Sequence, residues 1–188
     1  MGEVVIHDWP LPYTSQLAER DFAGVDLVVI HCTELPDLAT ARSYGERELY
    51  DDGTGNSGHY YIDRSGATYN FVPDHRIAHH TRGFNPRSIG IELINIGRFP
   101  DWFDSRHQAM DEPYTATQIA SLKGLLAHLV RIIPSLALIA GHEDLDTERV
   151  PASDNAELRV ARKRDPGPLF PWDDVLAACR LQRLRATV

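Results

Sequence analysis

Cysteine is scarce in this sequence, which has two among 188 residues, Cys32 and Cys179. They lie far apart and resemble no disulfide framework, so we expect a fold that does not depend on covalent cross-links. Cys32 stands within an apolar run, which predicts a buried thiol. With 43% hydrophobic residues the chain can form a core of its own. We expect one domain over residues 1–188, with its core at about residues 25–184.

Positive charge and long apolar runs are also lacking. The 19 Lys and Arg residues are outnumbered by 27 Asp and Glu, which gives a net charge of −8. This balance argues against a nucleic-acid partner, because phosphate binding needs a basic face. No apolar run is long enough to span a membrane, and residues 1–12 lack the pattern of a signal peptide. The expected location is the cytoplasm; export without a cleavable signal and the oligomeric state are left open.

Short apolar segments alternate with helical patterns along the chain. Buried strands are predicted at residues 26–31, 88–94 and 136–140, and a β-hairpin at 59–63 and 67–71. Helices are predicted at residues 36–50, from a capping box at Thr115 and Gln118 onward, and at 171–184. Residues 143–162 form a charged insertion that we expect to be exposed. This alternation predicts an α/β fold with a central mixed β-sheet flanked by α-helices.

Four polar residues occupy positions typical of a site. His31, His142 and Asp165 stand where strands end or loops begin, and Glu92 lies inside a strand. Two imidazoles and one carboxylate that leave a coordination position for water are a donor set suited to catalytic zinc. The spacing of these residues alone does not establish a metal site, because a lone histidine at a strand end is more often structural.

Six segments, in order along the chain, resemble those of one known family. They are VVIHCT (28–33), SGHYYIDRSG (57–66), IAHHT (77–81), SIGIEL (88–93), AGH (140–142) and RKRDPGP (162–168). The family is that of the type-2 N-acetylmuramoyl-L-alanine amidases, which share a fold with peptidoglycan-recognition proteins and phage T7-type lysozyme. Within this family, the segments resemble those of the AmpD-like branch, which recycles cell-wall fragments. The resemblance therefore implies the peptidoglycan-recognition-type amidase fold.

The resemblance also implies an activity and a site. The activity is hydrolysis of the amide bond between the lactyl group of N-acetylmuramic acid, or its anhydro form, and L-alanine in muropeptides. One Zn²⁺ per chain would be held by His31, His142 and Asp165, with Glu92 as general base and Lys163 as partner of the oxyanion. T7-type relatives place a tyrosine immediately before the hairpin histidine. Here that position is Gly58, which leaves Glu92 as the better candidate for the proton transfer.

Each of these residues also has a purely structural interpretation. Glu92 could pair with an arginine, and Lys163 could belong to a solvated basic run. Asp165 could start the turn made by Pro166 and Gly167, a role that is compatible with metal ligation. Because residues 143–162 separate the second histidine from Asp165, Asp144 is an alternative ligand.

Substrate contacts are expected near residues 77–87. Muropeptide stems carry several carboxylates, and Arg76, Arg82 and Arg87 could pair with them, or be ordinary surface arginines. His80 either lines the pocket and touches substrate or is a buried structural histidine. Asn85 is a candidate for a hydrogen bond to the peptide backbone. The long loop at residues 99–113 carries Trp102 and Phe103, which could stack on sugar rings or anchor the loop.

Two other functions stay open on the sequence. One is a peptidoglycan-binding module of the same fold that does not cut its ligand, although the complete set of site residues argues against it. The other is a zinc hydrolase of a different amide. The sequence does not distinguish anhydro-muropeptides from intact peptidoglycan, and it does not indicate a preferred length of stem peptide.

Overall fold

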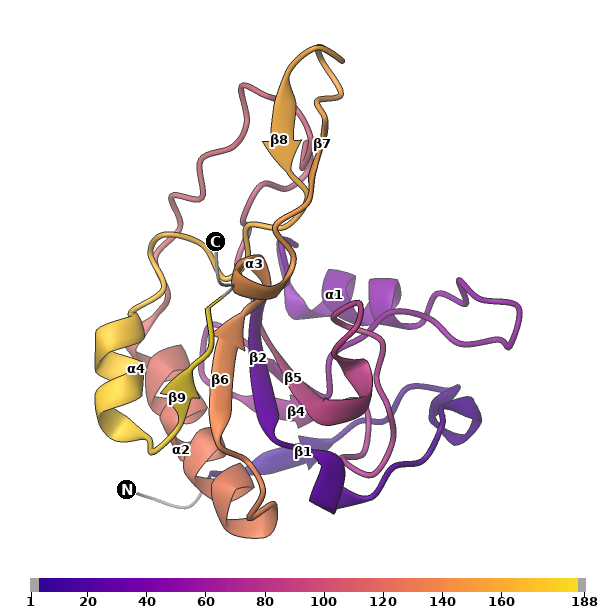
Figure 1. Cartoon of the computed structure of the whole chain (residues 1–188), viewed down its shortest axis with the longest axis vertical. Coiled ribbons are helices and arrows are strands. Elements are labelled where there is room, and N and C mark those ends of the chain that lie inside the picture. Colours follow the sequence, from indigo (N-terminus) through magenta and orange to yellow (C-terminus); the bar gives the residue numbers. More distant parts are fainter. Residues whose placement is uncertain (1–3, 186–188) are drawn as a thin grey trace.

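A seven-stranded sheet forms the centre of the fold (Figure 1). In spatial order its strands are β1 (Ile6–Asp8), β4 (Thr68–Asn70), β3 (Tyr60–Ile62), β5 (Ser88–Leu93), β2 (Leu27–Cys32), β6 (Leu138–Gly141) and β9 (Gln182–Arg183). The β3–β4 hairpin is antiparallel and the other neighbouring pairs are parallel. The structure is a computed structural model that describes residues 4–185, so both ends of the expected domain, 1–188, lie outside the described residues. The prediction of a single domain stays a prediction.

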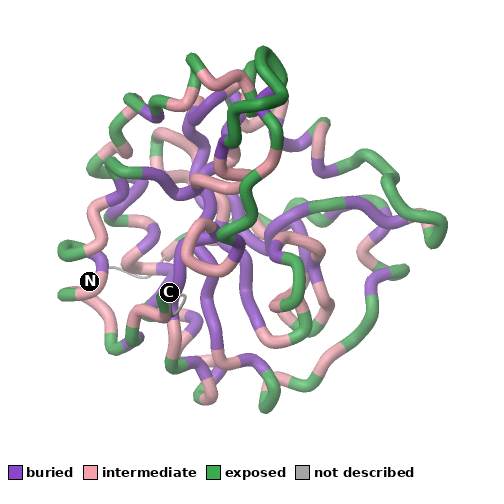
Figure 2. The backbone as a smooth tube through the Cα atoms, turned by 45° about the horizontal axis from the view of Figure 1, so that its top comes forward, coloured by how far each residue is buried: buried purple, intermediate pink, exposed green. Residues whose placement is uncertain are grey.

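The alternation of side chains along the strands divides the core between the two faces of the sheet. Val28 and Ile30 of β2 pack with Ile89 and Ile91 of β5 against the buried leucines of α2 (Ala116–Ile132). The helix α4 (Trp172–Ala178) contributes to the same cluster. A second cluster, on the side of α1 (Leu38–Gly45), gathers aromatic and aliphatic side chains that include Tyr61 and Phe71. Figure 2 shows the central strands buried, with exposed residues in the peripheral loops.

The predicted mixed sheet with flanking helices is confirmed, and so is the capping box at the start of α2. The Thr115 side chain accepts a hydrogen bond from the Gln118 N–H, and the Gln118 side chain accepts one from the Thr115 N–H. Three 3₁₀ helices complete the helical segments: η1 (Thr14–Gln16), η2 (Phe22–Gly24) and η3 (Asn85–Arg87). Among residues 4–185, no helix is both long and apolar enough to cross a membrane.

Two predicted helices are too long. The helix expected at residues 36–50 ends at Gly45, and Leu49, expected in the core, is 56% exposed. Glycine is a poor helix former, and beyond it the N–H groups of Leu49 and Tyr50 both donate to the carbonyl of Thr54. The helix expected at residues 171–184 ends at Ala178, because the chain then adds β9 to the edge of the sheet beside β6.

The charged insertion at residues 143–162 is mostly exposed, as expected, but it is not irregular. It contains the short helix α3 (His142–Leu145) and an antiparallel hairpin of β7 (Arg149–Pro151) and β8 (Arg159–Ala161). The hairpin projects beyond the sheet at the top of Figure 1. The 99–113 loop packs beside it, since the Ser153 N–H donates to the carbonyl of Phe103.

Candidate metal and catalytic site

The candidate site lies where three neighbouring parallel strands end. His31 near the end of β2 is in register with Glu92 on β5, and adjacent residues in register place their side chains on the same face. That face is opposite α2, because Val28 and Ile30 alternate with His31. His142 follows β6 directly as the first residue of α3. Open parallel sheets commonly bind ligands beyond the carboxyl ends of their strands.

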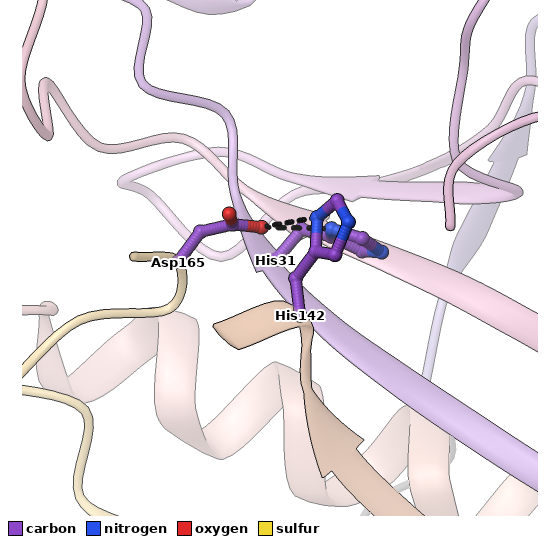
Figure 3. Close-up of side chains that lie close together, drawn as sticks. All are labelled: His31, His142 and Asp165. Carbon is purple, nitrogen blue, oxygen red and sulfur yellow. Dashed lines mark hydrogen bonds and ion pairs between the residues drawn. The ribbon is translucent and has the colours of Figure 1, made fainter. Parts of the chain in front are cut away.

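Three buried side chains converge at this edge of the sheet (Figure 3). The same oxygen of Asp165, Oδ2, lies 2.9 Å from Nδ1 of His31 and 3.1 Å from Nδ1 of His142. One potential ligand atom from each residue lies within 4.8 Å of those of the other two. The exposed fractions of the residues are 2% for both histidines and 3% for Asp165. We call His31, His142 and Asp165 the triad; it offers two nitrogens and an oxygen as closely spaced ligand atoms.

The donor set of the triad fits zinc. Imidazole and carboxylate are both zinc ligands, and three protein ligands are the number found at open catalytic sites. Two buried polar atoms of the triad, Oδ1 of Asp165 and Nε2 of His142, have no hydrogen-bond partner among the described residues. The alternative ligand, Asp144, is held elsewhere: its carboxylate pairs with Arg183 at 3.0 Å and accepts from the Gly141 N–H.

Two members of the triad, Asp165 and His31, have pKa values shifted toward the forms that bind metal. Burial alone would raise the pKa of Asp165, but His142 and His31 more than offset this and hold that pKa well below its usual range. Burial lowers the pKa of His31 to about 4, although the hydrogen bond to Asp165 acts in the opposite direction. An ionised carboxylate and a neutral imidazole are the forms that bind metal.

Glu92 lies at the side of the triad, with Oε1 3.9 Å from Nδ1 of His31. Burial raises the pKa of Glu92 to about 8, with a further contribution from the negative charge of Asp165 and an opposing one from Lys163. Gly58 makes room for this carboxylate, since a Cβ at that position would meet Cγ of Glu92 at 2.8 Å. A tyrosine at position 58 would displace Glu92. The glycine and the glutamate are therefore linked sterically.

A cavity of about 820 Å³ opens above the triad. Its lining includes Lys163, His80, Arg82 and Asn85, together with the triad and Glu92. His80 places Nδ1 3.0 Å from Nε2 of His31, while Arg82 pairs with Glu148 at 2.6 Å across the rim. Oδ1 of Asn85 accepts from the backbone N–H groups of His80 and Thr81, so this side chain holds the loop. Trp102 and Phe103 also line the cavity.

Arg76 and Arg87 lie outside the lining of this cavity. Arg76 pairs with Glu19 at 2.9 Å and donates to the carbonyl of Leu17, whereas Arg87 pairs with Asp26. Proximity in sequence suggested that they cluster with Arg82. The turn of η3 instead directs Arg87 toward the start of β2.

The sequence does not predict that Glu34, Arg98 and Arg47 line the cavity. Glu34 and Arg98 form a buried ion pair of 2.6 Å in the wall of the cavity. Arg47 lies two residues after the end of α1, with its guanidinium carbon 3.5 Å from the centroid of the Tyr44 ring. Arg47 and Arg98 lie outside the recognised motifs, and only the folded chain brings them to the cavity.

A family model described as N-acetylmuramoyl-L-alanine amidase matches residues 21–168. The chain belongs to the N-acetylmuramoyl-L-alanine amidase family. The resemblance drawn from the six motifs is thereby confirmed. The match covers all the strands of the sheet except β1 and β9, and it includes the triad, Glu92 and Lys163.

Individual relatives agree with this membership. The N-acetylmuramoyl-L-alanine amidase AmiD of Escherichia coli is 28% identical over 177 residues, which cover 86% of this chain and 56% of AmiD. The chain thus spans little more than half the length of that relative. AmpDh3 of Pseudomonas aeruginosa, in complex with an anhydromuramic pentapeptide, superposes with a TM-score of 0.63 at 25% identity, covering 82% of this chain and 60% of that one.

The fold is also shared with more distant proteins. The endolysin LysCS of Clostridium intestinale has a TM-score of 0.67 at 18% identity, and the match covers 96% of this chain and 99% of that chain. Drosophila peptidoglycan recognition protein SA has a TM-score of 0.63 at 17% identity, with coverage of 98% and 96%. These two likenesses concern the fold, which is that of the amidases and the peptidoglycan-recognition proteins.

Proposed function

We propose that the chain is a zinc-dependent N-acetylmuramoyl-L-alanine amidase that acts on peptidoglycan fragments. The observation that supports it most directly is the convergence of two histidine nitrogens on one oxygen of Asp165, with Glu92 beside them at the base of the cavity. A binding module would not require an acid/base residue beside a metal donor set. The retained Glu92 and Lys163 therefore favour catalysis over binding alone.

The substrate class is inferred from relatives. The E. coli AmiD structure contains the substrate anhydro-N-acetylmuramic acid-L-Ala-D-gamma-Glu-L-Lys. We infer that this chain accepts muropeptides of the same class, cutting between the lactyl carbonyl and the nitrogen of L-alanine. The cavity of about 820 Å³ lies within the common size range of ligand sites, roughly 300–1,000 Å³.

His31, His142 and Asp165 would hold the zinc ion, which when bound acidifies water and polarises a carbonyl oxygen. Glu92 takes a proton from the attacking water and passes it to the alanine nitrogen as the carbon–nitrogen bond breaks. The products are a lactyl carboxylic acid on the sugar and a peptide with a free amino terminus. The ammonium group of Lys163, in the lining of the same cavity, stabilises the negative charge that develops on the carbonyl oxygen.

Mass spectrometry of a defined muropeptide incubated with zinc-loaded protein tests this proposal. The wild-type chain should release a stem peptide that begins with L-alanine, and a chelator should abolish the release. Glu92→Gln should lower kcat by about 10²- to 10⁴-fold, the usual contribution of acid/base catalysis, because the amide cannot accept the proton. Its zinc content should stay near that of the wild type.

The exposed Glu157, at the tip of the β7–β8 hairpin, provides the matched control, and Glu157→Gln should retain full activity. If the muropeptide stays intact in both its anhydro and its reduced-sugar form, amidase activity at this bond is ruled out. If Glu92→Gln loses its zinc, Glu92 holds the metal or the fold rather than the proton.

A further inference from the structure

The lining of the cavity is rich in arginine, although the chain as a whole carries a net charge of −8. Three of the lining arginines are already neutralised by carboxylates of the protein. Arg98 pairs with Glu34, Arg82 with Glu148, and Arg162 with Asp146. These three arginines hold the walls of the cavity together. Because their charges are already neutralised, they are less suited to bind a negatively charged ligand.

Arg47 differs from them. Among residues 4–185, the side chain of Arg47 forms no ion pair and donates no hydrogen bond. Its guanidinium group lies over the ring of Tyr44, 3.5 Å from the centroid, and both residues line the cavity. Stacking on an aromatic face fixes the position of the guanidinium without using its N–H donors. The N–H donors at the edge of the Arg47 guanidinium therefore remain available to bind an anion in the cavity.

Arg47 belongs to the part of the cavity wall that the segment after α1 forms. The segment that follows α1 reaches away from the sheet in Figure 1, whereas His31 of the triad lies near the end of β2. Leu49, Tyr50 and Asn56 of that segment also line the cavity. Among residues 4–185, two cations of the lining have no carboxylate partner: Lys163, beside the triad in sequence, and Arg47, beside exposed aromatic and apolar side chains.

We propose that Arg47 binds the free α-carboxylate of the second stem-peptide residue, a γ-linked glutamate, and so selects substrates that carry this charge. The inference rests on the proposed amidase function. A γ-linkage uses the side-chain carboxyl of glutamate, so its α-carboxylate stays ionised. It is the first carboxylate on the peptide side of the scissile amide. Arginine and carboxylate form two parallel charge-assisted hydrogen bonds, a geometry that a carboxamide cannot reproduce.

Two synthetic muropeptides that differ at a single group test the inference. One has D-glutamate at the second position and the other has D-isoglutamine, in which the α-carboxylate is a carboxamide. The wild-type chain should cleave the first with the higher kcat/KM. Arg47→Gln should lower kcat/KM for the carboxylate substrate by about 10- to 100-fold, the range of one charge-assisted hydrogen bond, and leave the carboxamide substrate nearly unchanged.

The loss should appear in KM rather than kcat, because a carboxylate remote from the scissile bond is bound equally in the ground and transition states. Arg47→Lys, which keeps the charge but not the fork, should restore part of the preference. Arg131→Gln, at the exposed end of α2, is the matched control and should behave as wild type. Because Arg47 is exposed, Arg47→Gln should keep the thermal midpoint of the wild type.

The possible failures are distinguishable. If the wild-type chain cleaves neither substrate, the amidase proposal fails and the inference fails with it. If the wild-type chain cleaves both and Arg47→Gln slows them by the same factor, or slows neither, the amidase proposal stands and the assignment of Arg47 is overturned.

Discussion

Each histidine of the triad has a second ring nitrogen, and the surroundings of that nitrogen differ between the two residues. Nε2 of His31 lies 3.0 Å from Nδ1 of His80, which in turn lies 3.0 Å from the Thr81 hydroxyl. The His80 ring fits against β5 only because position 90 is glycine, where a Cβ would meet the ring at 2.6 Å. His80 is thus built into the wall of the cavity in a position that orients the ring of His31.

This arrangement predicts that His80→Ala weakens zinc binding without removing a ligand. Partners of metal-bound histidines fix the orientation of the ring, and their loss typically lowers metal affinity or activity about 10- to 100-fold. Competition with a chromophoric chelator measures the zinc dissociation constant. His107→Ala, in the exposed part of the 99–113 loop, should bind zinc as tightly as wild type. An unchanged constant in His80→Ala would leave His80 as a substrate contact or a packing residue only.

At the scale of elements, one buried ion pair joins three segments around the cavity. Glu34 follows β2 and Arg98 follows β5, and their side chains meet at 2.6 and 2.9 Å. Nη1 of Arg98 also donates to the carbonyl of Ala161 at the end of β8, at 2.9 Å. Arg98 is 1% exposed. The pair therefore holds the base of the β7–β8 hairpin, and with it the segment that carries Lys163, against the sheet.

Arg98→Met should lower the free energy of unfolding by about 3–5 kcal/mol, because it leaves the Glu34 carboxylate buried and unpaired. Adding Glu34→Gln should recover part of the loss, since the uncompensated charge is then removed. Urea unfolding in the presence of a chelator measures both variants without a contribution from metal. Arg180→Met, at an exposed arginine after α4, is the control and should unfold as wild type does. Equal stabilities of Arg98→Met and wild type would contradict a structural role for the pair.

At this scale, the sequence predicts those elements whose formation depends on residues close together along the chain. The strand around Val28 and Ile30 and the capping box at Thr115 are visible because apolar periodicity and cap chemistry act over a few residues. The pairing of β9 with β6 is not visible, since it depends on two segments more than 40 residues apart. The same holds for Arg47 and Arg98. The motifs identify the triad and Glu92 as candidates, whereas Arg47 and Arg98 reach the cavity wall through tertiary contacts.

At the scale of the molecule, the candidate metal site gathers residues that are distant along the chain. His31 comes from the second strand in sequence, His142 follows the sixth, and Asp165 precedes the last helix. A ligand that binds all three residues binds the folded chain and has no comparable site in the unfolded one. Zinc should therefore stabilise the whole fold by mass action, independently of any activity.

The thermal midpoint should accordingly rise with free zinc. At a concentration 100 times the dissociation constant the gain is about 2.7 kcal/mol, which for a domain of this size corresponds to a rise of about 5–11 °C. Asp165→Asn keeps the shape of the side chain but removes the charge that both histidines face, so its midpoint should rise much less. Differential scanning calorimetry at several zinc concentrations measures both. The same rise in Asp165→Asn would place zinc binding elsewhere, and a flat response in the wild type would exclude a zinc site at the triad.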